Sequence, residues 1–278
     1  MKDTLQKLRA SLVPLYGKGE AEAIIRLMFH HLKGWNLTDI LIHQDSELSE
    51  YMKGEINRIL ERLLRSEPIQ YIVGEARFQG MNLKIRPGVL IPRPETEELV
   101  DIIVDENKDK DDLRVLDVCT GSGCIAIALA RNLPFSKVYA VDFSEVALEV
   151  AKENSELLKT KIRLIEGDIF NWEPEGKFNI IVSNPPYVMD KEAVGMEKNV
   201  LDYEPHEALF VRDEAPLVFY DRISDIALTH LAPDGKLYFE INPLTASSLR
   251  GMLQSKGFRD ISILLDSSGR QRFISCNL

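Results

Sequence analysis

An alternation of short apolar runs and helical segments, which begins at residue 113, restricts the fold more than any other feature. Five apolar runs have the length and composition of buried strands; they cover 114–118, 138–142, 162–168, 178–183 and 236–241. Helical patterns separate most of them, and two more runs, 261–265 and 272–276, predict a closing hairpin. Strands that alternate with helices favour a parallel sheet, so the sequence predicts an α/β domain.

The first 65 residues have a helical pattern instead. Apolar residues recur at three- and four-residue steps, as in Leu5, Leu8, Leu12 and Leu15. We expect Ser46 to cap the last of these helices, and breaks between helices at Gly17, Gly19, Gly34 and Asn36. The pattern predicts a small helical bundle that recognises a partner or supports the catalytic domain.

A connector links the two patterns. Residues 76–78 and 81–85 alternate around Gln79-Gly80, which predicts a β-hairpin. Residues 89–97, Val-Leu-Ile-Pro-Arg-Pro-Glu-Thr-Glu, predict an extended segment that enters a helix ending near residue 104, with a charged loop at 105–112. We therefore expect a helical substrate-recognition domain at 1–67, a hairpin connector at 68–94 and a catalytic domain at 95–278.

Composition and charge exclude several classes of protein. The N-terminus lacks the apolar core of a signal peptide and no run is long enough to span a membrane, so we expect a cytoplasmic protein. Three cysteines and five histidines show no metal-ligand spacing. The net charge is −10. Residues 1–94 contain 14 Lys+Arg and 11 Asp+Glu and have a charge of +3, so residues 95–278 have a charge of −13. An acidic catalytic part without a basic stripe argues against stable nucleic-acid binding.

The fourth strand ends in Asn184-Pro185-Pro186-Tyr187. Prolines stop a strand and lack the backbone donor, so their carbonyls remain as acceptors. Asn184 adds a side-chain carbonyl and Tyr187 a flat aromatic face. Alone, such a tetrapeptide is more often a simple turn. At a strand's carboxyl end, where open α/β sheets bind ligands, it suits a planar group that carries an NH2.

Three acidic residues stand at successive strand ends around a glycine turn. Asp117 precedes the turn at 119–124, Cys-Thr-Gly-Ser-Gly-Cys, and can receive a cation. Asp142 ends the second strand, where an acid can bind ribose hydroxyls, and Asp168 ends the third, where an acid can accept from an adenine amine. Each could instead be a cap or turn residue. Together they favour a positively charged adenosine ligand, S-adenosylmethionine (AdoMet), over a dinucleotide.

The chain resembles the HemK/PrmC family of N5-glutamine methyltransferases, which modify class 1 peptide-chain release factors. The resemblance rests on residues 90–97, 120–124, 167–168 and 184–187, on Asp142, on 203–209 (Tyr-Glu-Pro-His-Glu-Ala-Leu) and on Asp266-x-x-Gly269-Arg270. It implies a Rossmann-like class I methyltransferase fold, a seven-stranded and mostly parallel sheet with an N-terminal helical bundle and a linking hairpin. We expect a monomer.

The resemblance also implies roles for individual residues. The methyl acceptor would be the side-chain amide nitrogen of the glutamine in the release factor's Gly-Gly-Gln motif. Asn184, Pro185 and Tyr187 are the expected catalytic residues, and together with Pro186 they would bind the substrate. Arg93, Pro94 and Glu95 would line the edge of the site. The expected cofactor-binding residues are Asp117, Cys119, Thr120, Gly121, Ser122, Gly123, Asp142, Asp168, Ile169 and Asn184.

Two departures and two alternatives remain at this point. Cys119 replaces a glycine usual in the family, so we expect backbone angles there that suit a non-glycine residue, and residues 241–243 lack an expected glycine. The Asn-Pro-Pro-Tyr motif also occurs in enzymes that methylate an adenine or cytosine amine of nucleic acid by base flipping. The second alternative is a cofactor-binding scaffold without catalysis.

Overall fold

The structure is a computed structural model that describes all residues from 1 to 278. The contacts divide the chain into two compact units. The first comprises Met1–Glu75 together with Glu197–Tyr203, and the second comprises Ala76–Met196 and Glu204–Leu278. None of the helices combines the length and the apolar character that crossing a lipid bilayer requires.

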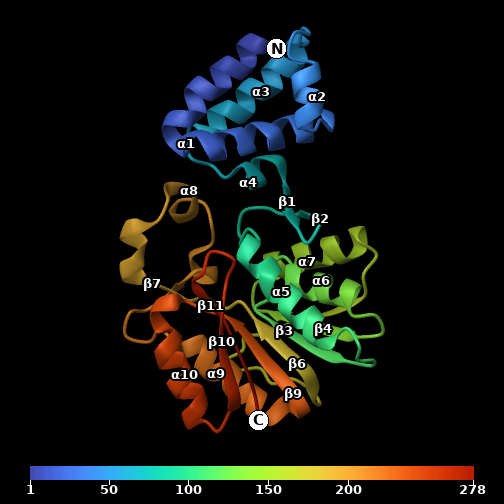
Figure 1. The fold of residues 1–278 in the computed structure, drawn as a ribbon, viewed down its shortest axis with the longest axis vertical. Helices are drawn as coiled ribbons and strands as arrows, with labels where there is room; N and C mark the ends of the chain where they lie inside the picture. Colours follow the sequence, from blue (N-terminus) through green and yellow to red (C-terminus); the bar gives the residue numbers. More distant parts are fainter. The chain divides into compact units, whose positions relative to one another are not determined.

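The first unit is the predicted helical bundle (Figure 1, blue). Its helices are α1 (Lys2–Lys33), α2 (Leu37–Ile42), α3 (Glu50–Leu63) and α4 (Ile69–Val73), joined by α8 (Lys198–Leu201). The predicted apolar stripe is largely the core, since Leu5, Leu8 and Leu12 are buried while Leu15 is exposed.

The helix ends correct two predictions. Ser49, not Ser46, caps α3 by accepting a hydrogen bond from the Met52 N–H, and Ser46 donates to the His43 carbonyl instead. Gly17 interrupts α1 with non-helical angles, but Gly19 lies inside the helix. Serine is a preferred N-cap residue at either position, and α3 begins directly after Ser49.

The second unit is built on one seven-stranded sheet with the order β10-β11-β9-β6-β3-β4-β5, which confirms the predicted sheet. Its strands are β3 (Arg114–Val118), β4 (Lys137–Asp142), β5 (Ile162–Glu166), β6 (Phe178–Ser183), β9 (Leu231–Glu240), β10 (Arg259–Leu265) and β11 (Gln271–Asn277). The first five pair in parallel, whereas β11 pairs antiparallel with both β9 and β10.

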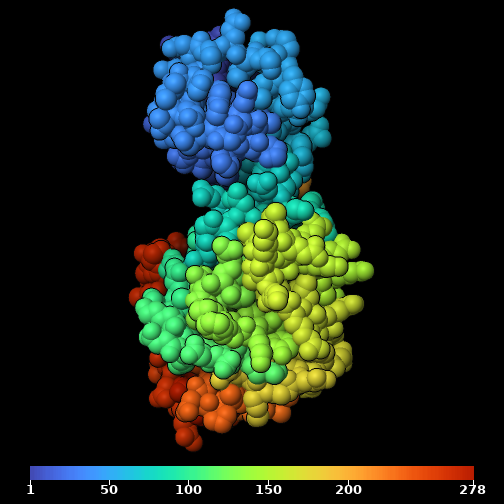
Figure 2. Space-filling model, turned by 90° about the vertical axis from the view of Figure 1, so that its right-hand side faces the viewer, coloured from blue at the N-terminus to red at the C-terminus, as the bar shows by residue number.

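Helices cover both faces of the sheet (Figure 1). One face packs against α5 (Pro94–Asn107) and α6 (Cys124–Asn132), with α7 (Glu145–Leu157) beside α6. The green to yellow atoms of these helices form a continuous surface in Figure 2. The opposite face packs against α9 (Val218–His230) and α10 (Ala246–Ser255). Each face has its own apolar core, so the sheet is buried on both sides, as its continuous apolar strands predict.

Smaller elements complete the second unit. The hairpin β1 (Glu75–Phe78) and β2 (Met81–Lys84) confirms its prediction. The insertion after Tyr187 contains β7 (Val188–Met189), η1 (Asp190–Gly195), η2 (His206–Ala208) and β8 (Phe210–Val211), and η3 (Pro243–Thr245) follows β9. Some boundaries differ from the sequence prediction: α5 extends to Asn107, β5 ends at Glu166, and β9 begins at Leu231 with an irregular register before Lys236.

Candidate active site

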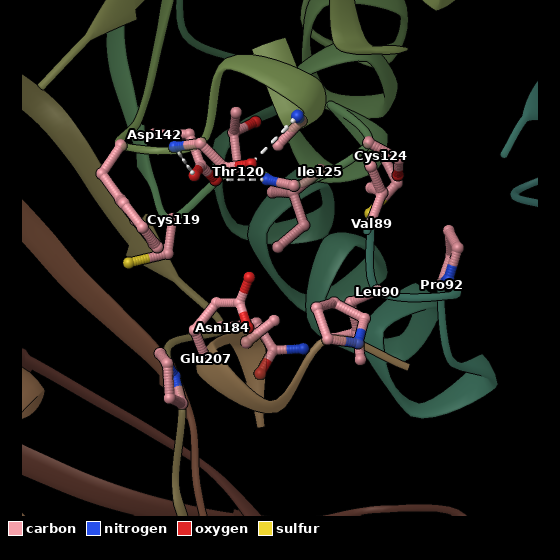
Figure 3. Close-up of a pocket in the computed structure, with 18 of the residues that line it drawn as sticks. Val89, Leu90, Pro92, Cys119, Thr120, Cys124, Ile125, Asp142, Asn184 and Glu207 are labelled. Atoms are coloured by element: carbon pink, nitrogen blue, oxygen red, sulfur yellow. Dashed lines mark hydrogen bonds between the residues drawn. The ribbon is translucent and has the colours of Figure 1, made fainter. Parts of the chain in front are cut away.

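The carboxyl ends of β3, β4 and β6 meet at one cavity of about 940 Å³, counting the open space at its mouth. Parallel strands end at the same edge of a sheet, so the segments after each of them are brought together there. Figure 3 shows Thr120 and Asp142 across the cavity from Asn184 and Glu207, with Val89, Leu90 and Pro92 at the side. All the lining residues belong to the second unit.

The glycine turn after β3 forms one wall. Cys119, Thr120, Gly121 and Ser122 line the cavity, whereas Gly123 lies behind them. Gly123 has φ +79°, and a Cβ there would stand 3.0 Å from the Ala151 Cβ, so only glycine lets the turn pack on α7.

One expectation about this turn is wrong. Cys119 has φ +62°, in the left-handed region that favours glycine, although we expected angles suited to another residue. Burial, followed by the charges of Asp142 and Asp117, raises the pKa of its thiol well above the usual value. The thiol is therefore neutral. A non-glycine residue in this left-handed conformation strains the backbone.

Asp117 lies beneath the turn and is completely buried, and it is not among the lining residues. Its Oδ2 accepts hydrogen bonds from the Thr120 hydroxyl (2.6 Å) and from the Ala126 N–H (3.1 Å), while Oδ1 has no partner. Burial raises the pKa of this carboxyl to about 7. These contacts brace the turn against α6, and the expected contact of Asp117 with a cation stays a prediction.

Asp142 is at the end of β4, and its carboxylate is fixed by backbone donors. Oδ2 accepts from the Gly121 N–H at 2.8 Å and Oδ1 from the Ser144 N–H at 3.0 Å. Burial raises the pKa of Asp142, and the backbone N–H groups oppose this rise. The side chain lines the cavity in one fixed orientation, which leaves its remaining lone pairs available to a ligand.

Asp168 and Ile169 line the same cavity beyond β5. Asp168 accepts from the Phe170 N–H and from the Asn171 side chain, so it also acts as the turn residue that the sequence allows. Ile169 is buried and belongs to the core that α9 and α10 cover. The two residues combine a carboxylate with an apolar wall.

The segment after β6 forms the opposite side of the cavity. Asn184 and Pro186 line it, while Pro185 and Tyr187 do not. The Asn184 Nδ2 donates to the Thr96 hydroxyl at 3.2 Å. The Tyr187 hydroxyl donates to Glu240 Oε1 at 3.0 Å, and burial followed by the Glu240 charge raises the pKa of Tyr187. Its ring packs against the core on the α9 and α10 side.

An ion pair joins the extended segment before α5 to the insertion. The Glu204 carboxylate accepts from the Ile91 N–H at 3.1 Å and from the Arg93 guanidinium at 2.5 Å. The Glu204 side chain is 1% exposed and that of Arg93 is 33% exposed. Of the three residues expected at the edge, Arg93 lines the cavity and Pro94 and Glu95 do not.

The structure also brings residues to the cavity that sequence reasoning did not assign. Some come from the segment before α5, some from the start of α7 and some from the insertion; they are Gly88, Val89, Leu90, Pro92, Thr96, Cys124, Ile125, Phe143, Ser144, Ala147, Gly167, Pro205, Glu207, Ala208 and Phe219. Several of them, such as Thr96 and Glu207, lie within the segments on which the resemblance rests, and this is the signal that could have identified them. Phe219, on α9, has no such signal.

Comparisons with known proteins agree with this geometry. Residues 3–74 match the model of the PrmC N-terminal domain, and residues 96–202 match that of the methyltransferase small domain. A release factor glutamine methyltransferase of Bacteroides thetaiotaomicron is 46% identical over 97% of both chains. One from Flavobacterium psychrophilum is 40% identical over 96% of this chain and 95% of its own. The chain belongs to the release factor glutamine methyltransferase family.

A solved structure confirms the fold of the family's catalytic part in this chain. The 16S rRNA N2 G1207 methyltransferase RsmC of Thermus thermophilus, solved with AdoMet and guanosine, has a TM-score of 0.54 and 20% identity. The match covers 73% of this chain and 49% of that one. At this identity the likeness shows the class I methyltransferase fold alone.

Proposed function

We propose that this protein transfers a methyl group from AdoMet to the side-chain amide nitrogen of the glutamine in the Gly-Gly-Gln motif of class 1 release factors. One observation carries the proposal: a single cavity is lined by the glycine turn and Asp142 on one side and by Asn184 and Pro186 on the other. The relatives named release factor glutamine methyltransferase align over nearly the whole chain, which supports a release factor as the substrate. We place this activity in the cytoplasm and expect a monomer.

The residues around the cavity fit AdoMet. The buried Ser122 hydroxyl interacts with the Cys124 thiol and makes no stronger hydrogen bond, and such an atom beside a glycine turn suits the polar tail of a ligand. Asp142 would take the ribose hydroxyls, and Asp168 and Ile169 the adenine. Thr120 and Gly121 would lie against the remainder. When bound, AdoMet supplies a methyl group on a positively charged sulfur.

The chain's own residues would position the glutamine. An amide nitrogen is a poor nucleophile because its lone pair is delocalised, so orientation and charge stabilisation must supply most of the rate. The Asn184 side-chain oxygen and the Pro185 carbonyl would each accept one N–H of the glutamine. These dipoles stabilise the positive charge that develops on the nitrogen during transfer. We expect Pro186 and Tyr187 to contact the flat amide, and the surplus proton to leave to water.

The test is methylation of a class 1 release factor with labelled AdoMet. A copy of the factor with its Gly-Gly-Gln glutamine changed to alanine serves as the matched control. Label on the native factor alone is expected. Label on both factors would place the acceptor elsewhere, and label on neither, with AdoMet binding intact, would refute the proposed substrate. Duplex DNA and RNA in the same assay test the nucleic-acid alternative, against which the net charge of −10 argues.

A second test addresses the acceptor group itself. Asn184→Ala removes the side-chain oxygen and should lower kcat at least about 10²-fold, by analogy with the loss of one preorganised dipole from a transition-state site. The affinity for AdoMet, measured by calorimetry, should change much less. Near-normal turnover in this variant would contradict the role of Asn184.

A further inference from the structure

A buried acid at the end of β9 connects to Asn184 through one hydroxyl. Glu240 is 1% exposed and Thr96 is 2% exposed. The Thr96 hydroxyl donates to Glu240 Oε2 at 2.7 Å, and the Tyr187 hydroxyl donates to Oε1 at 3.0 Å. The Asn184 Nδ2 then donates to the oxygen of Thr96 at 3.2 Å. These four residues form one continuous chain of hydrogen bonds.

Counting hydrogens gives this chain a direction. An ionised carboxylate accepts and cannot donate, so Glu240 takes the single hydroxyl hydrogen of Thr96. The Thr96 oxygen then offers only lone pairs to its other neighbour. Asn184 must therefore present its NH2 to Thr96, and its carbonyl oxygen is turned away from Thr96. A neutral hydroxyl without Glu240 could satisfy Asn184 equally well in the flipped orientation.

We propose that Glu240, acting through Thr96, is the positioning residue that fixes Asn184 with its carbonyl as the acceptor for the methylated amide. The inference rests on the proposed function and deepens it, since it explains why the site selects a group with N–H donors. A flipped Asn184 would present NH2 to the substrate's NH2, and two donors cannot bond. Neither Glu240 nor Thr96 needs to touch the substrate for this role.

The hydrogen bonds of Glu240 are those of an ionised carboxylate, although burial opposes ionisation. Burial raises the pKa of Glu240, and the hydroxyls of Thr96 and Tyr187 and the charge of Arg272 oppose this rise. The nearby Glu95 acts in the same direction as burial. Both carboxylate oxygens accept from hydroxyl groups, which is how a buried carboxylate is stabilised.

The decisive variants reverse the direction of the hydrogen bonds and leave the shapes of the side chains nearly unchanged. In Glu240→Gln, the Tyr187 hydroxyl, for which the residue at 240 is the one acceptor among the bonds described here, should keep the new amide oxygen, so the amide nitrogen would donate to Thr96. Thr96 then donates to Asn184, which must flip. In the double variant Glu240→Gln with Asn184→Asp, the aspartate accepts from Thr96 with one oxygen and still offers its second oxygen to the substrate. The single variant Asn184→Asp leaves one hydroxyl hydrogen between two carboxylates.

Steady-state methylation and AdoMet calorimetry separate the outcomes. We expect Glu240→Gln to lower kcat at least about tenfold and to change the Kd for AdoMet less than threefold, because orientation of one amide dipole is lost. The double variant should recover at least about tenfold over Glu240→Gln. A Glu240→Gln enzyme within threefold of the wild type, or a double variant no faster than Glu240→Gln, would overturn the proposal. Thermal melting identifies variants that lose activity by unfolding.

Thr96 gives a second test if Glu240→Gln does not fold. Thr96→Val keeps the shape of the side chain but removes the hydroxyl, while Thr96→Ser keeps the hydroxyl. Thr96→Ser should turn over at least about tenfold faster than Thr96→Val, because only the serine orients Asn184. Equal rates in the two folded variants would overturn the proposal.

A measurement without substrate keeps this inference separate from the proposed function. In ¹⁵N-labelled protein, the side-chain NH2 of Asn184, assigned from its loss in Asn184→Asp, should show one hydrogen-bonded proton. That signature should persist in Thr96→Ser and disappear in Thr96→Val. The same signature in both would overturn the inference, whether or not the wild type methylates a release factor. Failure of the wild type on the release factor alone would concern only the proposed function.

Discussion

Removing the Arg93 guanidinium tests how strongly the edge of the cavity depends on one ion pair. Arg93→Met keeps most of the side chain's length but leaves the Glu204 carboxylate, 1% exposed, with the Ile91 N–H as its one remaining partner among the bonds described here. Removing one partner of a buried pair costs about 3–5 kcal/mol because a buried charge is left uncompensated. Arg93 is one-third exposed, so water reaches the site and we expect about 2–3 kcal/mol.

Urea unfolding of the second unit measures this loss. The protein has two tryptophans, Trp35 in the first unit and Trp172 in the second. In a Trp35→Phe background the fluorescence of Trp172 therefore reports on the second unit alone. The free energy of unfolding of Arg93→Met should fall by the stated amount relative to this background.

The control variant removes the Glu204 charge and does not restore the ion pair with Arg93. Glu204→Gln removes the charge and can still accept from the Ile91 N–H through its amide oxygen. The double variant Arg93→Met with Glu204→Gln should therefore lie within about 1 kcal/mol of the background, since the uncompensated charge is gone. A loss below about 1 kcal/mol for Arg93→Met, or a double variant as unstable as the single one, would refute the reasoning.

Three further predictions concern the turn and the acids. Gly123→Ala should cost about 2–4 kcal/mol in urea unfolding, from a left-handed alanine and a Cβ 3.0 Å from Ala151, and Gly121→Ala, whose Cβ meets nothing within 4 Å, should cost less than half of that. The pKa of Asp117 is raised from 3.8 to about 7, so its contribution to stability is present below pH 4 and is lost as the pH rises through 7. The free energy of unfolding should therefore fall by at most about 4 kcal/mol between pH 4 and 7.5 because of this residue. Asp117→Asn should remove this fall when urea unfolding is measured at pH 4, 5.5 and 7.5. Asp142→Ala should weaken AdoMet binding at least about tenfold in calorimetry, because hydrogen bonds to a charged acceptor contribute about 1.5–3 kcal/mol; unchanged affinity would remove Asp142 from the site.

The sequence is sufficient where local pattern and residue type decide the structure. The strand at 178–183 has the predicted bounds because an apolar run stops at two prolines, and the residues of the glycine turn lie at the cavity because parallel strands end at one edge. The helix before β3 ends later than predicted, at Asn107, a common turn residue whose side-chain NH2 here donates to the Ile103 carbonyl inside α5. The start of β9 was also predicted too late, because the strand has an irregular register before Lys236.

Other features depend on contacts that no local pattern contains. Asp117 is completely buried and bonds to Thr120 and Ala126, contacts that its position in the sequence does not reveal, while its predicted contact with a cation stays a prediction. The strain at Cys119 was missed because a non-glycine residue suggested ordinary angles. Tyr187 was expected beside the substrate for its aromatic face, while its hydroxyl bonds to an acid 53 positions away.

The register between β6 and β9 explains why Glu240 can act on Asn184 at all. Ser183 pairs with Phe239 across these parallel strands, so Asn184, directly after β6, and Glu240, the last residue of β9, lie at the same level. Thr96, 144 positions from Glu240, comes from the first turn of α5 and bridges the two. Side chains alternate faces along a strand, so a slip of one residue would direct Glu240 to the opposite face of the sheet. The orientation of the proposed acceptor thus depends on the pairing of two strands in the core, and variants that disturb this pairing should lower turnover even where the cavity itself is unchanged.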